Sequence, residues 1–150
     1  GIAGFPRDMI NRNPDDPVPG GGFTPGLHIS KMYEGAKKRG WLIIPDTSPL
    51  RSQVAGIGAA SFALLPGDYY CTMREGAVYD GKPASGEHVG VVLDVSKPDA
   101  KGEVKVTTAD GGQSCGDDQC AHWNKHTLLP NGHLVKGGPW TRLAWVVRAA

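Results

Sequence analysis

The sequence predicts a single α+β domain in which helices come first and an antiparallel sheet follows. A chain of 150 residues has the length of one domain. Helical spacing of apolar residues is confined to the N-terminal part, whereas segments rich in Val with alternating polar residues begin near residue 64. Short turns separate these segments, which favours antiparallel pairing. We therefore expect residues 1–150 to form one domain with N-terminal helices packed on an antiparallel sheet.

Two N-terminal segments have helical patterns. The first covers residues 2–13 and begins near Ala3, and the Pro- and Gly-rich residues 14–22 end it. The second begins with Thr24, a capping residue that is followed by proline at the first helical position. It carries three basic residues in its last turn and ends before Gly40.

The rest of the chain predicts mainly strands. The predicted strands, each bounded by turn residues, cover residues 41–44, 68–73, 88–95, 103–108 and 141–148. Residues 128–135 predict a hairpin, because they straddle the Asn-Gly pair that begins at Asn131. Residues 49–63 are rich in small residues and are a candidate for a further helix, although two internal glycines weaken it.

Charge and composition exclude several classes of function. Sixteen Lys and Arg residues stand against 15 Asp and Glu residues, so the net charge of +1 does not supply the basic surface that nucleic-acid binding requires. No apolar run approaches the roughly 20 residues of a membrane helix. Gly20–Gly22 lack the sequence context of a phosphate-binding loop. We expect no nucleic-acid partner, no membrane span and no cofactor.

Three short motifs occur in a recognisable order. They are Leu-Pro-Gly-Asp-Tyr-Tyr at 65–70, Glu-His-Val-Gly-Val-Val at 87–92 and Thr-Ala-Asp-Gly-Gly-Gln at 108–113. In this order they resemble the papain-like cysteine peptidases and amidases of the NlpC and CHAP types. In that family the first motif opens the sheet, the second carries the catalytic histidine and the third supplies a polar residue that orients it. The resemblance implies a papain-like fold and thiol-dependent cleavage of amide bonds.

The residues themselves indicate the same histidine and carboxylate. His88 begins one predicted strand and Asp110 ends the next, so antiparallel pairing brings them to the same edge of the sheet. A carboxylate that accepts from one ring nitrogen leaves the other to take a proton from a nucleophile. We expect a separation of roughly 2.6–3.2 Å or a bridging water. Gln113 is a second candidate for the orienting role, and a purely structural His-carboxylate pair is the alternative.

The resemblance implies a nucleophilic cysteine at the start of the first helix, where the helix dipole lowers the pKa of a thiol. Ala3 stands at that place. Either Ala3 replaces the cysteine, by engineering or by natural loss, or the thiol lies upstream of Gly1. Cys71 is expected to be a packed core thiol, and Cys115 falls in a predicted loop with no helix to activate it, so neither replaces the missing nucleophile.

A second cluster contains Cys115, Cys120, His122 and His126, which together are the ligand types of a zinc site. The four-residue gap between the cysteines and the single residue between Cys120 and His122 are not usual spacings for zinc ligands. The two cysteines would equally suit a disulfide or a pair of unpaired thiols. We expect no stoichiometric metal.

The predicted function is cleavage of peptide amide bonds in the bacterial cell wall. A thiolate would attack the carbonyl, His88 would move protons, Asp110 would orient His88, and backbone amides near the helix start would stabilise the oxyanion. The protein would be a wall-remodelling enzyme, a lysin or an antibacterial effector toxin, secreted or periplasmic, with an immunity or inhibitor protein as a candidate partner. The alternatives are a binding domain that has lost the thiol and a metal-stapled interaction module on residues 115–126.

Overall fold

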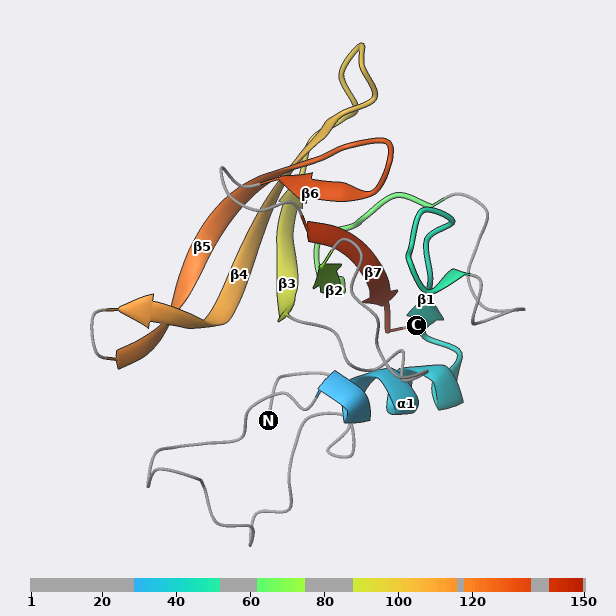
Figure 1. The fold of residues 1–150 in the computed structure, drawn as a ribbon, viewed down its shortest axis with the longest axis vertical. Coiled ribbons are helices and arrows are strands. Elements are labelled where there is room, and N and C mark those ends of the chain that lie inside the picture. The colour runs from blue at the N-terminus through green and yellow to red at the C-terminus, as the bar shows by residue number, and fades with distance from the viewer. Residues whose placement is uncertain (1–28, 52–61, 75–87, 116–117, 136–140, 150) are drawn as a thin grey trace, which may run out of the picture.

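The computed structural model describes residues 29–51, 62–74, 88–115, 118–135 and 141–149 (Figure 1). The elements are α1 (Ile29–Arg39), β1 (Leu42–Ile43), β2 (Tyr69–Arg74), β3 (His88–Val95), β4 (Val104–Cys115), β5 (Asp118–Leu128), β6 (His133–Val135) and β7 (Thr141–Val147). Within these ranges no helix has both the length and the apolar character needed to cross a membrane. The helix α1 has 11 residues.

Six of the strands close into an antiparallel barrel. Their order around the barrel is β7, β2, β3, β4, β5 and β6, and β6 pairs back to β7. The short strand β1 pairs with the end of β7, with Leu42 opposite Val147. Closure gives every barrel strand a partner on both sides, so it removes the unpaired edges of an open sheet.

The predicted papain-like α+β fold is wrong. The described structure is mostly β, with a closed six-stranded barrel, one further strand and one short helix. The main reason is the hairpin of β4 and β5, because β4 continues to Cys115 and Asp118–Leu128 form a strand that the sequence did not predict. The helix predicted over residues 2–13 lies outside the described residues, as does most of the candidate helix in residues 49–63.

Several individual elements agree with their predictions. The strand β3 has the predicted bounds, and β2 and β7 differ from theirs by one residue at one or both ends. The hairpin around Asn131 is confirmed by the pairing of Leu128 with Leu134. The second predicted helix is confirmed from Ile29 to its end, where Gly40 has a φ of 74° and Trp41 N–H donates to the carbonyl of Ala36.

Two apolar clusters lie on opposite sides of the barrel wall, because successive side chains on a strand point to opposite faces. The cluster inside the barrel contains Leu64, Tyr70, Val92, Val106, Leu134, Leu143 and Val146. The cluster outside it joins α1 to the outer face of β2 and β7, and there Tyr33 packs edge-on against Trp145 with ring centroids 5.7 Å apart. Cys71 is buried in this outer cluster, as expected.

The Pro-Gly-Asp motif has a clear structural role. Asp68 closes the turn before β2, since its carboxylate accepts from Leu65 N–H at 2.8 Å. The same buried carboxylate forms a two-pronged ion pair with Arg148, in which Nε and Nη2 of the guanidinium each lie 2.8 Å from a carboxylate oxygen. The motif thereby fixes the start of β2 beside the end of β7.

Candidate functional site

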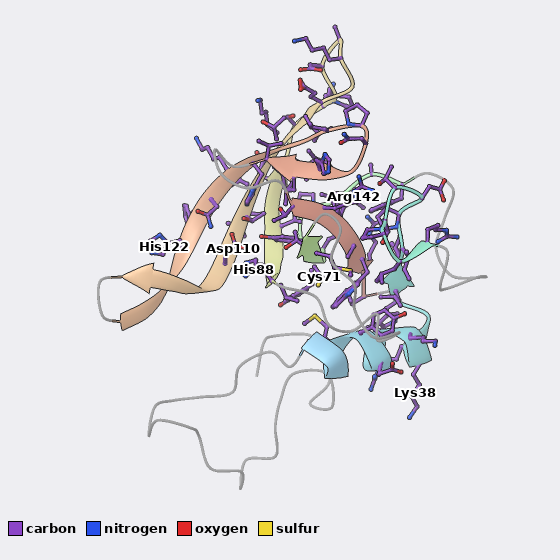
Figure 2. The ribbon with its side chains drawn as sticks, viewed as in Figure 1. Lys38, Cys71, His88, Asp110, His122 and Arg142 are labelled. Carbon is purple, nitrogen blue, oxygen red and sulfur yellow. The ribbon has the colours of Figure 1, made fainter. Side chains whose placement is uncertain are left out.

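Polar side chains gather at one end of the barrel interior, around the carboxylate of Asp110. They come from four neighbouring strands and comprise Tyr70, His88, Thr108, Asn124 and His126. Asp110 is only 1% exposed. Figure 2 shows Asp110 and His88 side by side at this end of the barrel. Buried polar groups of this kind are stable only where they are hydrogen-bonded to one another.

Strand register explains why these groups meet. Tyr70 lies opposite Gly90, and the register of β3 with β4 places Asp110 on the other side of Gly90. A Cβ atom on Gly90 would lie 2.0 Å from Asp110 Oδ1 and 2.8 Å from Tyr70 Cε1. The absence of a side chain at Gly90 therefore lets Tyr70 and His88 both reach the carboxylate.

The predicted contact between His88 and Asp110 is confirmed. His88 Nε2 lies 2.9 Å from Asp110 Oδ1, and the side chain of His88 is 31% exposed. Because an ionised carboxylate can only accept, Nε2 carries the proton and donates it, which leaves Nδ1 as the unprotonated nitrogen of the neutral ring. The geometry is that of a base held by an orienting carboxylate, and its catalytic role stays a prediction.

Asp110 accepts hydrogen bonds on both oxygens. Oδ1 accepts from His88 and from the hydroxyl of Tyr70. Oδ2 accepts from Thr108 Oγ1 at 2.6 Å and from Asn124 Nδ2 at 2.7 Å. Four donors occupy the acceptor sites of the carboxylate, so its position is fixed from β2, β3 and β5 as well as from β4 itself.

The same contacts set the ionisation of the site. Burial alone would raise the pKa of Asp110, but the polar groups around it, His126 and His88 first and then Asn124 and Thr108, hold that pKa well below its usual range. Burial raises the pKa of Tyr70, and its hydrogen bond to Asp110 raises it further. At neutral pH the carboxylate is therefore charged and the phenol is a hydrogen-bond donor.

Comparison with known proteins does not assign this chain to a family. No family model matches the sequence, and no curated protein or solved structure is measurably similar to it. The resemblance to papain-like peptidases and amidases therefore depends on the three sequence motifs alone. The roles that it implies for Ala3, His88 and Asp110 stay predictions.

A second histidine lies against the same carboxylate. His126 Nε2 is 3.1 Å from Thr108 Oγ1 and 4.0 Å from Asp110 Oδ2. Because the Thr108 hydroxyl donates to Asp110, it accepts from His126, which places the proton of His126 on Nε2. His126 Nδ1 is buried and has no hydrogen-bond partner among the described residues. Asp110 therefore lies between two imidazoles, of which His88 is the more exposed.

The remaining predicted site residues are not brought into this cluster by any described contact. Ala3 lies outside the described residues. Gln113 lies on β4 beyond a bulge, with its backbone opposite Cys120, and its side chain is not among those that the structure describes. Sequence reasoning missed Tyr70, Thr108 and Asn124 as site residues, and it assigned His126 to the candidate zinc cluster instead of to this site. The period-two spacing of Thr108 with Asp110, and of Asn124 with His126, was the signal that could have revealed them.

The segment around the cysteines is a hairpin and not the predicted loop. The backbones of Cys115 and Asp118 pair at the tip of β4 and β5. The side chains of Cys115 and Cys120 are not among those described, so a disulfide, a metal site and unpaired thiols all stay open there. Among the described side chains, no group of three His, Cys, Asp or Glu residues is arranged to hold a metal ion.

Proposed function

We propose that His88 and Asp110 are the acid-base pair of a hydrolase that cleaves amide bonds in bacterial cell-wall peptides. The observation that supports this is the 2.9 Å contact between His88 Nε2 and Asp110 Oδ1, in which the carboxylate is buried and the ring is one-third exposed. The buried charge fixes the tautomer and stabilises the imidazolium that forms during proton transfer. The exposed ring can reach a substrate.

In the proposed reaction His88 Nδ1 removes the proton of a thiol, and the thiolate attacks the amide carbonyl. The C–N bond breaks, the imidazolium gives its proton to the leaving amine, and a thioester remains. Water, deprotonated by His88, then hydrolyses the thioester and regenerates the thiol. The motif resemblance assigns the thiol to position 3, where this sequence has Ala3, so this chain lacks the nucleophile of its own proposed reaction.

The variant Ala3→Cys tests the proposal. We expect it to release new amines from purified peptidoglycan, to lose this activity on treatment with a thiol alkylator, and to be labelled by that reagent fastest at residue 3. The double variant Ala3→Cys with His88→Asn is the matched control, and it should have the thiol but no activity. Equal labelling of Cys115 with no hydrolysis would contradict the proposal.

A second candidate is a binding domain that has kept the site and lost the thiol, and Ala3 itself favours it. The codon for position 3 in the natural gene separates the two candidates, because a cysteine indicates an enzyme and an alanine a binding domain. A native alanine also predicts that the chain binds peptidoglycan without releasing amines. Either candidate would act in the periplasm or outside the cell, where an immunity or inhibitor protein could bind it.

A further inference from the structure

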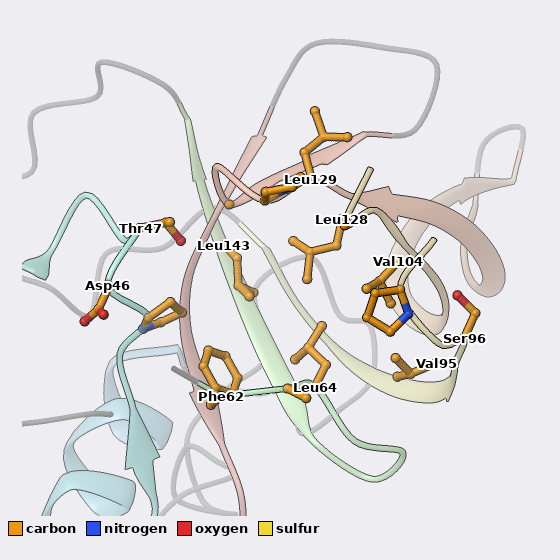
Figure 3. Close-up of a pocket in the computed structure, with 16 residues that line it drawn as sticks. Asp46, Thr47, Phe62, Leu64, Val95, Ser96, Val104, Leu128, Leu129 and Leu143 are labelled. Atoms are coloured by element: carbon orange, nitrogen blue, oxygen red, sulfur yellow. The ribbon is translucent and has the colours of Figure 1, made fainter. Parts of the chain in front are cut away.

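The barrel has a cavity at the end opposite Asp110. The cavity has a volume of about 330 Å³, and its walls include Phe62, Leu64, Val95, Val104, Leu128 and Leu143 (Figure 3). None of the side chains around Asp110 lines it. His88 and Val95 are the two ends of β3, and seven residue steps along a strand span roughly 23 Å. The cavity is therefore separate from the candidate hydrolase site.

The cavity lies where the apolar cluster inside the barrel is not completely covered and reaches the solvent. Deep in the barrel Val92 and Val106 are each 1% exposed, so the core is sealed there. Phe62, Val104 and Leu128 pack on the same cluster but remain partly exposed. An apolar surface that is concave and open to solvent at a barrel mouth is a typical small-molecule site.

The rim of the cavity is held in place by a close backbone approach. Gly132 has a φ of 90°, and a Cβ atom there would lie 2.5 Å from Thr47 Oγ1. The turn between β5 and β6 thus lies directly against the segment after β1, and Thr47, Pro130 and Gly132 all line the cavity. A rim formed by packed turns favours a preformed site.

The chemistry of the lining selects an uncharged ligand. The walls are aliphatic and aromatic, and the polar side chains among the described lining residues are Asp46, Thr47 and Ser96. Asp46 is the one charged residue among them, and its Oδ1 lies 3.7 Å from Arg51 Nε. Because the described lining residues include no Lys or Arg, an anionic head group would find no counter-charge among them and would face the carboxylate of Asp46.

We propose that this cavity binds an uncharged apolar small molecule, either a two-ring aromatic compound or an alkyl chain of medium length. An apolar cavity of about 150 Å³ holds one benzene ring, so a cavity of about twice that volume suits a ligand of this size. A single hydroxyl on the ligand would lie at the rim beside Thr47 and Ser96. The proposal does not depend on the proposed hydrolase function.

The test is a fluorescence titration of the full chain with the neutral probe N-phenyl-1-naphthylamine. We expect saturable one-site binding with a Kd of roughly 1–100 µM. At pH 8, 1-decanol should displace the probe at a concentration at least about 10-fold lower than decanoate does, because only decanoate is charged. Absence of saturable binding, or equal displacement by the two competitors, would overturn the proposal.

A matched pair of tryptophan variants locates the site. Val104→Trp fills the cavity and should weaken probe binding by about 10-fold or more, whereas Leu93→Trp, at an exposed position on β3 outside the cavity, should change it less than about twofold. Amide shifts of the unaltered protein provide a readout that does not depend on how the variants fold. The probe should shift Val95, Val104 and Leu128 and leave His88 unchanged, and the reverse pattern would contradict the proposal.

Discussion

Gly90 is the residue on which the arrangement of the polar site most directly depends. Tyr70, Gly90 and Asp110 form a row across three strands, and the phenol of Tyr70 donates to Asp110 over the bare backbone of Gly90. A methyl group at this position would occupy the space that the carboxylate uses to reach His88. The glycine is needed here for close approach and not for an unusual backbone conformation.

We expect Gly90→Ala to lower the free energy of unfolding by about 2–3 kcal/mol, because the new methyl group must displace the carboxylate of Asp110. Denaturant unfolding measures the loss. In the background of Asp110→Ala the clash with the carboxylate is gone, so the same glycine substitution should be clearly less destabilising. Equal losses in the two backgrounds would show that the contact with Asp110 is not the cause.

Tyr70→Phe removes one of the four donors to Asp110, and we expect it to cost about 1.5–3 kcal/mol at pH 7, the usual range for a hydrogen bond to a charged group. The raised pKa of Tyr70 also means that the unfolded chain releases this proton first, near pH 10, so the stabilising effect is lost as pH rises beyond that point. The free energy of unfolding, measured from pH 8 to 11, should therefore fall less steeply for the variant. An unchanged alkaline slope would contradict this assignment.

At the scale of elements, apolar strands were predictable and the polar strand was not. The strand β3 is rich in Val, and its bounds followed from that pattern. The strand β5 directs Asn124 and His126 to the interior and Trp123 to solvent, with Trp123 82% exposed, so its polarity is the reverse of an ordinary amphipathic strand. The period-two spacing of Asn124 and His126 places both on one face of β5, but no local pattern shows that this face meets Asp110 on β4.

The energetic effect of the close contact at Gly132 can be measured by comparison with Gly67, a second glycine with nearly the same φ. Gly132 and Gly67 have φ values of 90° and 94°, but a Cβ atom would meet Thr47 only at Gly132 and would find open space at Gly67. We expect Gly67→Ala to cost about 1 kcal/mol from backbone strain alone, and Gly132→Ala to cost about 1–3 kcal/mol more. Thermal unfolding of both variants measures the difference. Equal losses in the free energy of unfolding would mean that the side chain of Thr47 can move aside without destabilising the fold.

At the scale of the whole molecule, the contact of His88 with Asp110 was predictable and the barrel was not. Two strands joined by a short turn fix which of their ends meet, so local sequence was sufficient for the contact. Closure depends on β6, a strand of three residues that pairs with β5 on one side and β7 on the other. The Asn-Gly signal predicted the pairing of β6 with β5, but no local pattern shows that its other edge pairs with β7. The cavity at the barrel mouth exists only once the strands have closed.

The buried carboxylate at the centre of the site gives the whole fold a dependence on pH. The pKa of Asp110 is lower in the folded protein than the value of about 4 in an unfolded chain, so its contribution to stability is present above pH 4 and is lost as pH falls toward the folded-state pKa. We expect this carboxyl to add a slope of up to about 1.4 kcal/mol per pH unit below pH 4. Urea unfolding from pH 2 to 7 should show that slope, and Asp110→Asn should lack it.

A direct measurement on the unaltered protein does not depend on whether the Asp110→Asn variant folds. Carbon-13 spectra of the carboxyl groups should show Asp110 still ionised at pH 3 in the folded protein. Titration of this carboxyl near pH 4 would contradict the assignment of its hydrogen-bond partners.

The position of β7 between β2 and β6 has a consequence for biosynthesis. β7 leaves the ribosome after the other five strands of the barrel, so β2 and β6 must each keep an unpaired edge until Val147 has emerged from the exit tunnel. Until then a nascent chain can pair through these edges with another copy. We expect nascent chains stalled before Thr141 to be digested rapidly by protease, and chains with Val147 well outside the tunnel to resist digestion.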